Sequence, residues 1–317
     1  MAVSTSSTTS EPHVNLRHDE IPISTARPTP RVLILQHVYP PKKSFWMNLR
    51  GKSEESLYKA SILSHQTYAR AWGHGYILDR TRWLGADDPR SKHLSKVYTL
   101  LHTVITELGR EEQGAEWIMF ADADTLILDP SISLSEFLPQ PHNHPSPIIL
   151  ANVDHRGFNA GVMIFRVSLR LATFLMDMLA NEIELFESIG IHPSDKHLFG
   201  YTLQQDKHKD VAEASVQIPQ RWLNAYHIEG DGPALHVHLV NQRKWEEDWK
   251  RTIIGRADEV YEEARRQKLV ISRGSSTRVG LRDALVQMNS WREARDVARE
   301  FWRDPKRGIG GIIFNEI

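Results

Sequence analysis

Residues 117–128 read Trp-Ile-Met-Phe-Ala-Asp-Ala-Asp-Thr-Leu-Ile-Leu, and this stretch decides the fold. Its first five residues are all apolar, which is typical of a strand that is buried on both faces of a sheet. The apolar run ends at two carboxylates, Asp122 and Asp124, and a turn signal follows at residues 129–130. Because open α/β sheets bind ligands outside the carboxyl ends of their strands, we expect a functional site at these two aspartates.

The sequence before this stretch predicts alternating strands and helices. Short apolar runs at residues 32–35 and 75–78 are expected to be strands. Residues 53–72 carry apolar side chains at helical spacing, between a candidate N-cap at Ser53 and a stop at Gly73. Residues 94–108 repeat this helical pattern. The order β-α-β-α ahead of residue 117 predicts an α/β fold with a Rossmann-like sheet.

The sequence after this stretch predicts three more strands and a change of character near the C-terminus. Strands are expected at residues 148–150, 162–165 and 235–240, and a helix from about Ser168 to Phe186, which together give a mixed sheet flanked by helices. After Trp245 the chain is charged and helical in pattern. We therefore predict a disordered Pro/Ser/Thr-rich tail over 1–30, one α/β domain over 31–245 and a helical C-terminal extension over 246–317.

The composition excludes several classes of protein. The 317 residues are 40% hydrophobic and 25% charged, and the formal net charge is −1, so the basic excess that drives nucleic-acid binding is missing. With no cysteine, neither a disulfide framework nor a thiolate metal site can form. The chain as given also has no apolar leader and no transmembrane segment, so we expect a soluble, cytoplasmic protein.

The two aspartates suit a hard divalent cation. On an extended segment, residues two apart face the same way, so both carboxylates could bind one Mn²⁺ or Mg²⁺ whose other ligands are diphosphate oxygens. Such an ion would stabilise the negative charge that develops on a leaving diphosphate. The alternative is that Asp122 and Asp124 only end a strand and solvate a loop.

Other polar residues are candidates for the same site. His236 and His238 share one face of a predicted strand, so one or both could complete the metal site, although both could equally be ordinary strand histidines. Lys244 could contact the diphosphate or be a surface lysine. Asn159 lies between glycines in residues 157–161, which we interpret as a turn or a ligand contact, and residues 219–226 mix aromatic and amide groups that suit a sugar.

In this order, these segments resemble glycosyltransferase family 34, the galactosyl/mannosyltransferase family of fungi and plants, and more distantly the glycogenin-like family 8. The resemblance runs from about Arg31 to Trp245. Its motifs are Tyr-Ala-Arg at 68–70 with His-Gly-Tyr at 74–76, the strand and aspartates at 117–124, Phe-Asn-Ala-Gly at 158–161, Pro-Gln at 219–220 with Asn-Ala-Tyr at 224–226, and His238 with Lys244.

The resemblance implies a GT-A nucleotide-diphospho-sugar transferase fold and a hexosyltransferase. The activity implied is metal-dependent transfer of galactose or mannose, or else xylose, from a UDP- or GDP-sugar to a glycan hydroxyl with retention. Residue by residue, it implies metal ligands at Asp122, Asp124 and His238, catalytic roles for Asp195 and Asn159, and donor contacts at Lys96, Asp122, Ala123, Asn159, Ala160, Gly161 and Lys244. Family members with an N-terminal anchor lie in the Golgi lumen, which is the location expected if an anchor precedes this chain.

The chain departs from the family pattern at three places, and two other functions compete. Asp195 is the nearest match to an acidic-Gln pair, with residues 204–206 as a rival; Asn241 replaces a glycine, and Trp245 follows Lys244 where proline is usual. One competing function is a catalytically silent sugar-nucleotide-binding protein. The other is a haloacid-dehalogenase-like phosphatase, which also places Asp-X-Asp after an apolar strand, although Leu126 and the third-strand position of the aspartates count against it.

Overall fold

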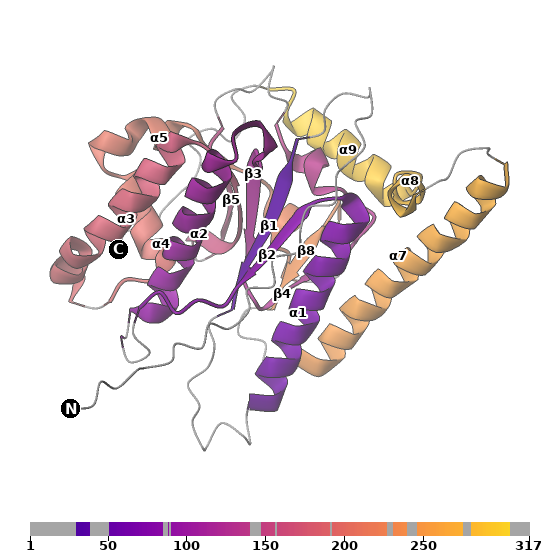
Figure 1. Ribbon diagram of the computed structural model, residues 1–317, viewed down its shortest axis with the longest axis horizontal. Helices are drawn as coiled ribbons and strands as arrows, with labels where there is room; N and C mark the ends of the chain where they lie inside the picture. Colours follow the sequence, from indigo (N-terminus) through magenta and orange to yellow (C-terminus); the bar gives the residue numbers. More distant parts are fainter. Residues whose placement is uncertain are drawn as a thin grey trace, which may run out of the picture.

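The computed structural model describes residues 30–38, 51–84, 88, 90–139, 147–155, 157–190, 192–226, 231–239, 246–274 and 280–304. Figure 1 shows a central sheet with helices on both sides. The sheet has six strands in the order β2-β1-β3-β6-β5-β7. The strands are β1 (Val32–His37), β2 (Gly75–Asp79), β3 (Trp117–Ala121), β5 (Ile149–Asp154), β6 (Gly157–Arg166) and β7 (Ser215–Gln217).

Both parallel and antiparallel pairs occur in this sheet. Strand β1 is parallel to β2 and to β3, and β7 is parallel to β5, whereas β6 is antiparallel to both β3 and β5. The mixed α/β sheet predicted from the sequence is therefore confirmed. One detail differs, because residues 157–161 lie within β6 and are not a turn.

Helices cover the two faces of the sheet, and apolar side chains alternate between them. In β3, Trp117 and Met119 belong to one buried cluster and Ile118 and Phe120 to the other, so every residue of the strand is buried. This explains the unbroken apolar run. The helices before residue 246 are α1 (Gly51–Trp72), α2 (Ser91–Gly109), α3 (Leu169–Ile189), α4 (Asp195–Leu203), α5 (Lys209–Glu213) and α6 (Gln220–Leu223), with 3-10 turns η2 (Glu111–Gln113), η3 (Leu134–Phe137) and η4 (Asp206–His208).

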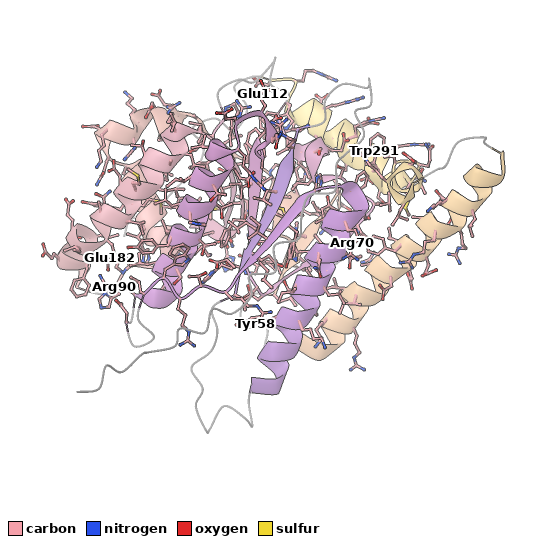
Figure 2. The ribbon with its side chains drawn as sticks, viewed as in Figure 1. Tyr58, Arg70, Arg90, Glu112, Glu182 and Trp291 are labelled. Carbon is pink, nitrogen blue, oxygen red and sulfur yellow. The ribbon has the colours of Figure 1, made fainter. Side chains whose placement is uncertain are left out.

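Helices α2 and α3 pack side by side on one face. Figure 2 labels Arg90, just before α2, next to Glu182 of α3. An Arg90 Nη1 atom lies 3.2 Å from a Glu182 carboxylate oxygen, and the side chain of Glu182 is almost fully buried. The ion pair therefore holds the start of α2 against α3. Lys96 lies in α2, about one and a half turns after its first residue.

A second, small sheet lies beside the first. It pairs β4 (Thr125–Ile127) with β8 (His236–His238) in antiparallel register, with Thr125 opposite His238. The strand predicted at 235–240 is therefore shorter than expected and lies outside the six-stranded sheet. Since β4 follows the two aspartates directly, this pairing brings the end of β8 to the carboxyl end of β3.

The C-terminal part is helical, as predicted, and packs on the α1 face. It comprises α7 (Glu246–Gly274), α8 (Leu281–Leu285) and α9 (Asn289–Phe301), and Figure 1 shows α7 alongside α1. The indole nitrogen of Trp302 donates to the carbonyl oxygen of Phe137 at 3.1 Å. The ring of Phe301 lies 5.0 Å from that of Trp222. In the described part of the chain, no helix has the length and apolarity that a bilayer crossing requires.

Candidate metal and donor site

Asp122, Asp124 and His238 form a group that could hold a metal ion. One ligand atom from each of the three side chains lies within 4.8 Å of the other two. Both aspartates lie in the connection between β3 and β4. The backbone N–H of Leu239, just after β8, donates to the carbonyl oxygen of Asp124 at 2.9 Å. The β4–β8 pairing therefore sets the histidine against the aspartates.

The two aspartates share a site for a reason other than the one expected. The sequence predicts an extended segment, but residues 122–125 form a turn in which the Thr125 hydroxyl donates to the Asp122 carbonyl oxygen at 2.7 Å. The backbone N–H of Asp122 donates to the carbonyl oxygen of Gly161 in β6 at 2.8 Å. Turn geometry and not strand alternation therefore brings the carboxylates together, with Ala123 between them.

His238 is held on two sides. Its Nε2 atom lies 3.2 Å from a carboxylate oxygen of Asp124, and its Nδ1 atom lies 2.8 Å from the side-chain oxygen of Asn224. Behind the ring is Gly161, where a Cβ atom would come within 2.1 Å of the His238 Cε1 atom. The site therefore needs glycine at position 161 so that the imidazole can approach Asp124.

His236 takes no part in this group. It is fully buried, and its Nε2 atom lies 3.0 Å from Nε2 of His65 in α1. Burial lowers the pKa of His65 to about 4, and burial also holds the pKa of His236 well below its usual range. Both rings are therefore neutral near pH 7 and belong to the core between α1 and β8. Of the two candidate histidines, the structure brings only His238 to the aspartates.

Lys96 links the metal group to Asp195. The lysine Nζ atom lies 2.7 Å from an Asp122 oxygen and 2.5 Å from an Asp195 oxygen, and it donates to the carbonyl oxygen of Ala160 at 3.1 Å. Lys96 comes from α2, whereas Asp195 is the first residue of α4. The structure thus unites five of the predicted site residues, Lys96, Asp122, Asp124, Asp195 and His238, in one cluster.

Burial and charge pull the pKa values in this cluster in opposite directions. Burial disfavours the ionised form of every member, and for Asp122 it wins, so that the pKa of this carboxyl is raised despite Lys96. For Lys96 the charges of Asp122 and Asp195 outweigh burial and raise its pKa. Burial also opposes ionisation of Asp195, but Lys96 and His93 overcome it and lower the pKa. A largely buried Lys96 cation therefore lies between the carboxyl groups of Asp122 and Asp195.

The carboxyl of Asp124 stays ionised because of His238. Burial again acts to raise its pKa, but the hydrogen bond and the charge of His238 outweigh burial and lower the pKa below its usual range. Two carboxylate oxygens and an imidazole nitrogen are ligands that suit Mn²⁺, and carboxylates alone suit Mg²⁺. The residues present therefore fit a divalent cation.

The side chain of Asn159 makes three hydrogen bonds to its neighbours. Its amide oxygen accepts from the backbone N–H of Gly161 at 2.8 Å, and its amide nitrogen donates to Asp154 at 2.7 Å and to the Tyr226 hydroxyl at 2.5 Å. A sugar oxygen that accepted from the Asn159 amide nitrogen would have to replace Asp154 or Tyr226, whereas the amide oxygen has a second lone pair that a sugar hydroxyl could use. The neighbouring Ala160 is buried in β6 and offers its carbonyl oxygen to Lys96. Lys244 lies outside the described residues.

Sequence reasoning missed several residues that border the site. Asp154, at the end of β5, accepts hydrogen bonds from Asn159 and from the hydroxyl of Tyr226. Asn152 in the same strand accepts from the amide of Asn224 at 2.9 Å. The two polar residues at alternate positions in the second half of β5, Asn152 and Asp154, are the signal that points these side chains to one face. His93, one turn before Lys96 in α2, lies 3.8 Å from Asp195.

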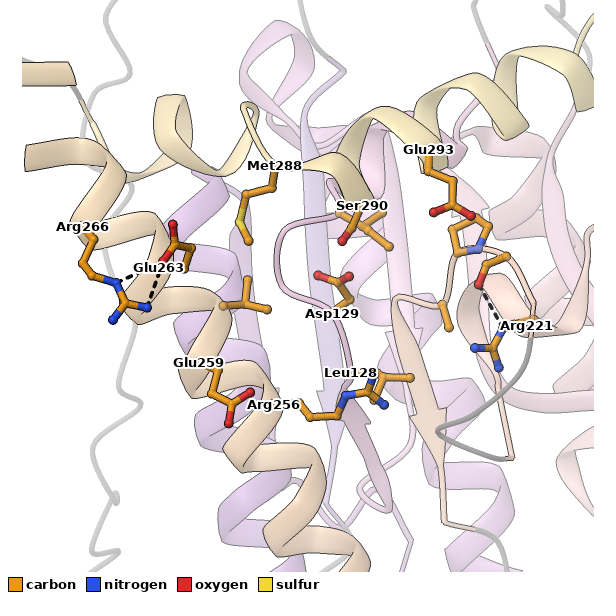
Figure 3. A pocket seen from close by; sticks show the side chains of 15 residues that line it. Leu128, Asp129, Arg221, Arg256, Glu259, Glu263, Arg266, Met288, Ser290 and Glu293 are labelled. Carbon is orange, nitrogen blue, oxygen red and sulfur yellow. Dashed lines mark hydrogen bonds and ion pairs between the residues drawn. The ribbon is translucent and has the colours of Figure 1, made fainter. Parts of the chain in front are cut away.

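A separate cavity of about 630 Å³ lies at the other end of the β4–β8 sheet. Figure 3 shows it between α7, the α8–α9 junction and the segment that follows β4, with Asp129, Arg256 and Glu293 among the side chains around it. Arg266 pairs with Glu263 across 2.8 Å on its rim. Because Thr125 and His238 mark the opposite end of the two strands, this cavity is distinct from the metal group.

Comparisons with known proteins found similarity to glycosyltransferases. The galactosyl transferase GMA12/MNN10 family model matches residues 142–249. Two Schizosaccharomyces pombe proteins named as probable alpha-1,2-galactosyltransferases are similar in sequence. The chain is 29% identical to gmh1 over 160 residues, 41% of this chain and 46% of gmh1. It is 26% identical to gmh2 over 198 residues, 50% of this chain and 54% of gmh2. The chain thus spans about half the length of these relatives.

A solved structure shares the fold. It is the crystal structure of a glycosyltransferase involved in the glycosylation of the major capsid of PBCV-1, with a TM-score of 0.51 and 14% sequence identity over 70% of this chain and 100% of that chain. The GT-A fold expected from the sequence is therefore confirmed. The family model and the two relatives likewise confirm the resemblance to the galactosyl transferase family.

Proposed function

We propose that the chain, related in sequence to the galactosyl transferase GMA12/MNN10 family and in fold to GT-A enzymes, is a metal-dependent glycosyltransferase. In this proposal it moves a hexose, galactose or mannose, from a UDP- or GDP-sugar to a glycan hydroxyl with retention. The observation that carries the proposal is the grouping of Asp122, Asp124 and His238 beside Lys96 and Asp195 at the carboxyl end of β3.

The roles proposed for the residues follow from their charges. Asp122, Asp124 and His238 would hold Mn²⁺ or Mg²⁺, which when bound supplies positive charge to the leaving diphosphate. Lys96, whose side chain is 13% exposed, would place a second positive charge beside Asp122 to support the same diphosphate. In this proposal Lys244 adds a further diphosphate contact. These positive charges would stabilise the negative charge that forms on the diphosphate when the sugar leaves.

Asp195 is the carboxylate proposed to act on the sugar. Lys96 and His93 keep it ionised and fix its position at the start of α4. An ionised carboxylate can stabilise the positive charge that develops at the anomeric carbon as the sugar–phosphate bond breaks. Asn159 is proposed to line the same pocket with Ala160 and Gly161, and its bonds to Asp154 and Tyr226 would fix the wall of that pocket.

Galactose is the first donor sugar to test, followed by mannose and xylose. The two relatives are named as galactosyltransferases, which supports galactose for the shared region. The acceptor is proposed to be a glycan or glycoconjugate. The proposed catalytic domain comprises residues 31–245. The helices after residue 246 pack on the same core and would support the domain.

The test is release of nucleoside diphosphate from a panel of UDP- and GDP-sugars, with and without Mn²⁺. We expect metal-dependent release from one donor, lost on adding a chelator and lost in Asp124→Ala. The matched control is Asp258→Ala, which removes an exposed carboxylate from α7 and should leave the rate unchanged.

The other outcomes would each select a different function. Mn²⁺-dependent binding of UDP or GDP without release from any donor, in the presence of glycan acceptors, would favour the silent sugar-nucleotide binder. Release of phosphate from phosphomonoesters that depends on Asp122 would favour the phosphatase. Release that proceeds at the wild-type rate in Asp124→Ala would refute the proposed site.

A further inference from the structure

Two buried amides lie behind His238 and form a chain of hydrogen bonds with it. The Asn224 amide nitrogen donates to the side-chain oxygen of Asn152 at 2.9 Å, and the Asn224 side-chain oxygen lies 2.8 Å from Nδ1 of His238. Asn152 and Asn224 are both 0% exposed, and His238 is 6% exposed. No solvent is therefore available to replace a lost partner in this chain.

The direction of this chain decides which ring nitrogen of His238 carries the proton. An amide oxygen only accepts hydrogen bonds, so Nδ1 of His238 must donate to Asn224. In a neutral imidazole the other nitrogen then has a free lone pair. That nitrogen is Nε2, which faces the Asp124 carboxylate at 3.2 Å.

Two acceptors in contact are unfavourable unless something positive lies between them. A lone pair on Nε2 and a carboxylate oxygen of Asp124 repel each other unless they share a proton or a cation. If both amides were reversed, the Asn224 nitrogen would donate to Nδ1 and the proton would sit on Nε2. That proton would occupy the position through which Nε2 could bind a metal.

The backbone keeps Asn224 in place. The N–H of His238 donates to the carbonyl oxygen of Ala225 at 2.8 Å, and the N–H of Ala225 donates to the carbonyl oxygen of His236 at 3.1 Å. These bonds place the segment that begins at Asn224 along the edge of β8. Asn152 approaches from β5 of the large sheet, so the amide pair connects the two sheets behind the metal group.

We propose that the Asn152–Asn224 pair is a positioning device that holds the His238 ring through its Nδ1 atom and so presents Nε2 as a metal ligand. This inference rests on the proposed function, because it assigns residues that prepare the metal site of that function. Groups that hydrogen-bond to metal-ligating histidines typically contribute about 10- to 100-fold to metal affinity. Neither asparagine touches the cation in this proposal.

The test measures binding of Mn²⁺ alone, by the electron paramagnetic resonance signal of the free ion, so that no turnover is needed. Asn224→Leu keeps similar bulk but removes the acceptor, and we expect Mn²⁺ affinity to fall by about 10- to 100-fold. In Asn224→Asp a carboxylate oxygen still accepts from Nδ1, and we expect affinity within a few-fold of wild type. The matched control is Asn181→Leu, which removes a buried amide that bonds to Thr202 and Gln205 away from the site.

A double-mutant comparison separates this role from a general loss of stability. If Asn224 acts through His238, the variant with Asn224→Leu and His238→Ala binds Mn²⁺ no more weakly than His238→Ala alone. Additive losses from the two changes would overturn the positioning role. If His238→Ala itself bound Mn²⁺ as wild type does, the metal group and with it the proposed function would fail as well.

A measurement on the unmodified protein covers the case in which the variants do not fold. The nitrogen chemical shifts of ¹⁵N-labelled histidine report which ring nitrogens carry a proton, and His238→Ala identifies the signal. We expect Nδ1 of His238 to carry a proton in the metal-free protein, because it donates to Asn224. An unprotonated Nδ1 would overturn the proposal.

Discussion

Replacing Gly161 by alanine should remove His238 from the metal site while leaving every proposed ligand in the sequence. A Cβ atom at position 161 would lie 2.1 Å from Cε1 and 2.4 Å from Nδ1 of His238. Ordinary contact begins near 3.4 Å, so the ring must retreat by more than an ångström. Because metal–ligand distances tolerate only about ±0.2 Å, this retreat ends ligation by Nε2.

The size of the effect follows from that displacement. Loss of one ligand's position should weaken Mn²⁺ binding by at least about 10- to 100-fold, which corresponds to roughly 1.4–2.7 kcal/mol. The overpacked site should also lower the free energy of unfolding by about 1–3 kcal/mol. Alanine itself is compatible with the backbone here, since Gly161 is not among the glycines with positive φ. Steric conflict with the imidazole is therefore the cause.

The assay is Mn²⁺ titration together with nucleoside diphosphate release, and Gly255→Ala is the matched control. A Cβ atom at Gly255, within α7, meets no atom within 4 Å, so this variant should bind Mn²⁺ and turn over like wild type. If Gly161→Ala binds Mn²⁺ with wild-type affinity, then His238 is not a metal ligand in the position that the structure gives it. Adding His238→Ala should relieve the clash and restore most of the lost stability.

Three further predictions concern charge, pH and the C-terminal helices. Asp195→Asn keeps the side-chain volume but removes the charge beside Lys96, and we expect kcat to fall by ~100-fold or more while Mn²⁺ affinity changes little; equal kcat would contradict the role of Asp195. Burial lowers the pKa of His74 to about 3, so the unfolded chain binds this proton more tightly. The free energy of unfolding should then fall as the pH drops below about 6.5, by up to ~1.4 kcal/mol per unit, with a smaller slope for His74→Gln in urea titrations. Trp302→Ala should cost about 3–5 kcal/mol in thermal or urea unfolding, because the indole is buried and bonded to Phe137; a loss below 1 kcal/mol, roughly that of a surface change, would contradict this.

The large sheet could be predicted because its strands and helices each have a recognisable pattern of apolar residues in the sequence. Apolar runs at β1 and β3 and the helical spacing of α1 and α2 each arise from burial of one segment against its neighbours. The predicted pairing of carboxylates after β3 rested on the same reasoning, and the structure brings Asp122 and Asp124 together. Their arrangement in a turn was not foreseeable, since it depends on a hydrogen bond to Gly161 in a strand that comes later in the chain.

Long-range pairing was the part that the sequence could not reveal. Strands β4 and β8 have three residues each, too few for a period-2 pattern to establish a partner. The two histidines of β8 look equivalent in the sequence, yet one faces His65 in the core and the other faces Asp124. A buried amide such as Asn224, which lies outside the strands, gives no periodic signal, and asparagine is also common in turns.

The pairing of β4 with β8 joins the region that the family model matches to a segment that precedes this region in the chain. The region that the family model matches, residues 142–249, contains His238, Asn224 and Asp195. Asp122, Asp124 and Lys96 all precede it. A segment cut to the matched region would therefore keep only His238 of the three proposed metal ligands and would lose the β4 strand that positions it.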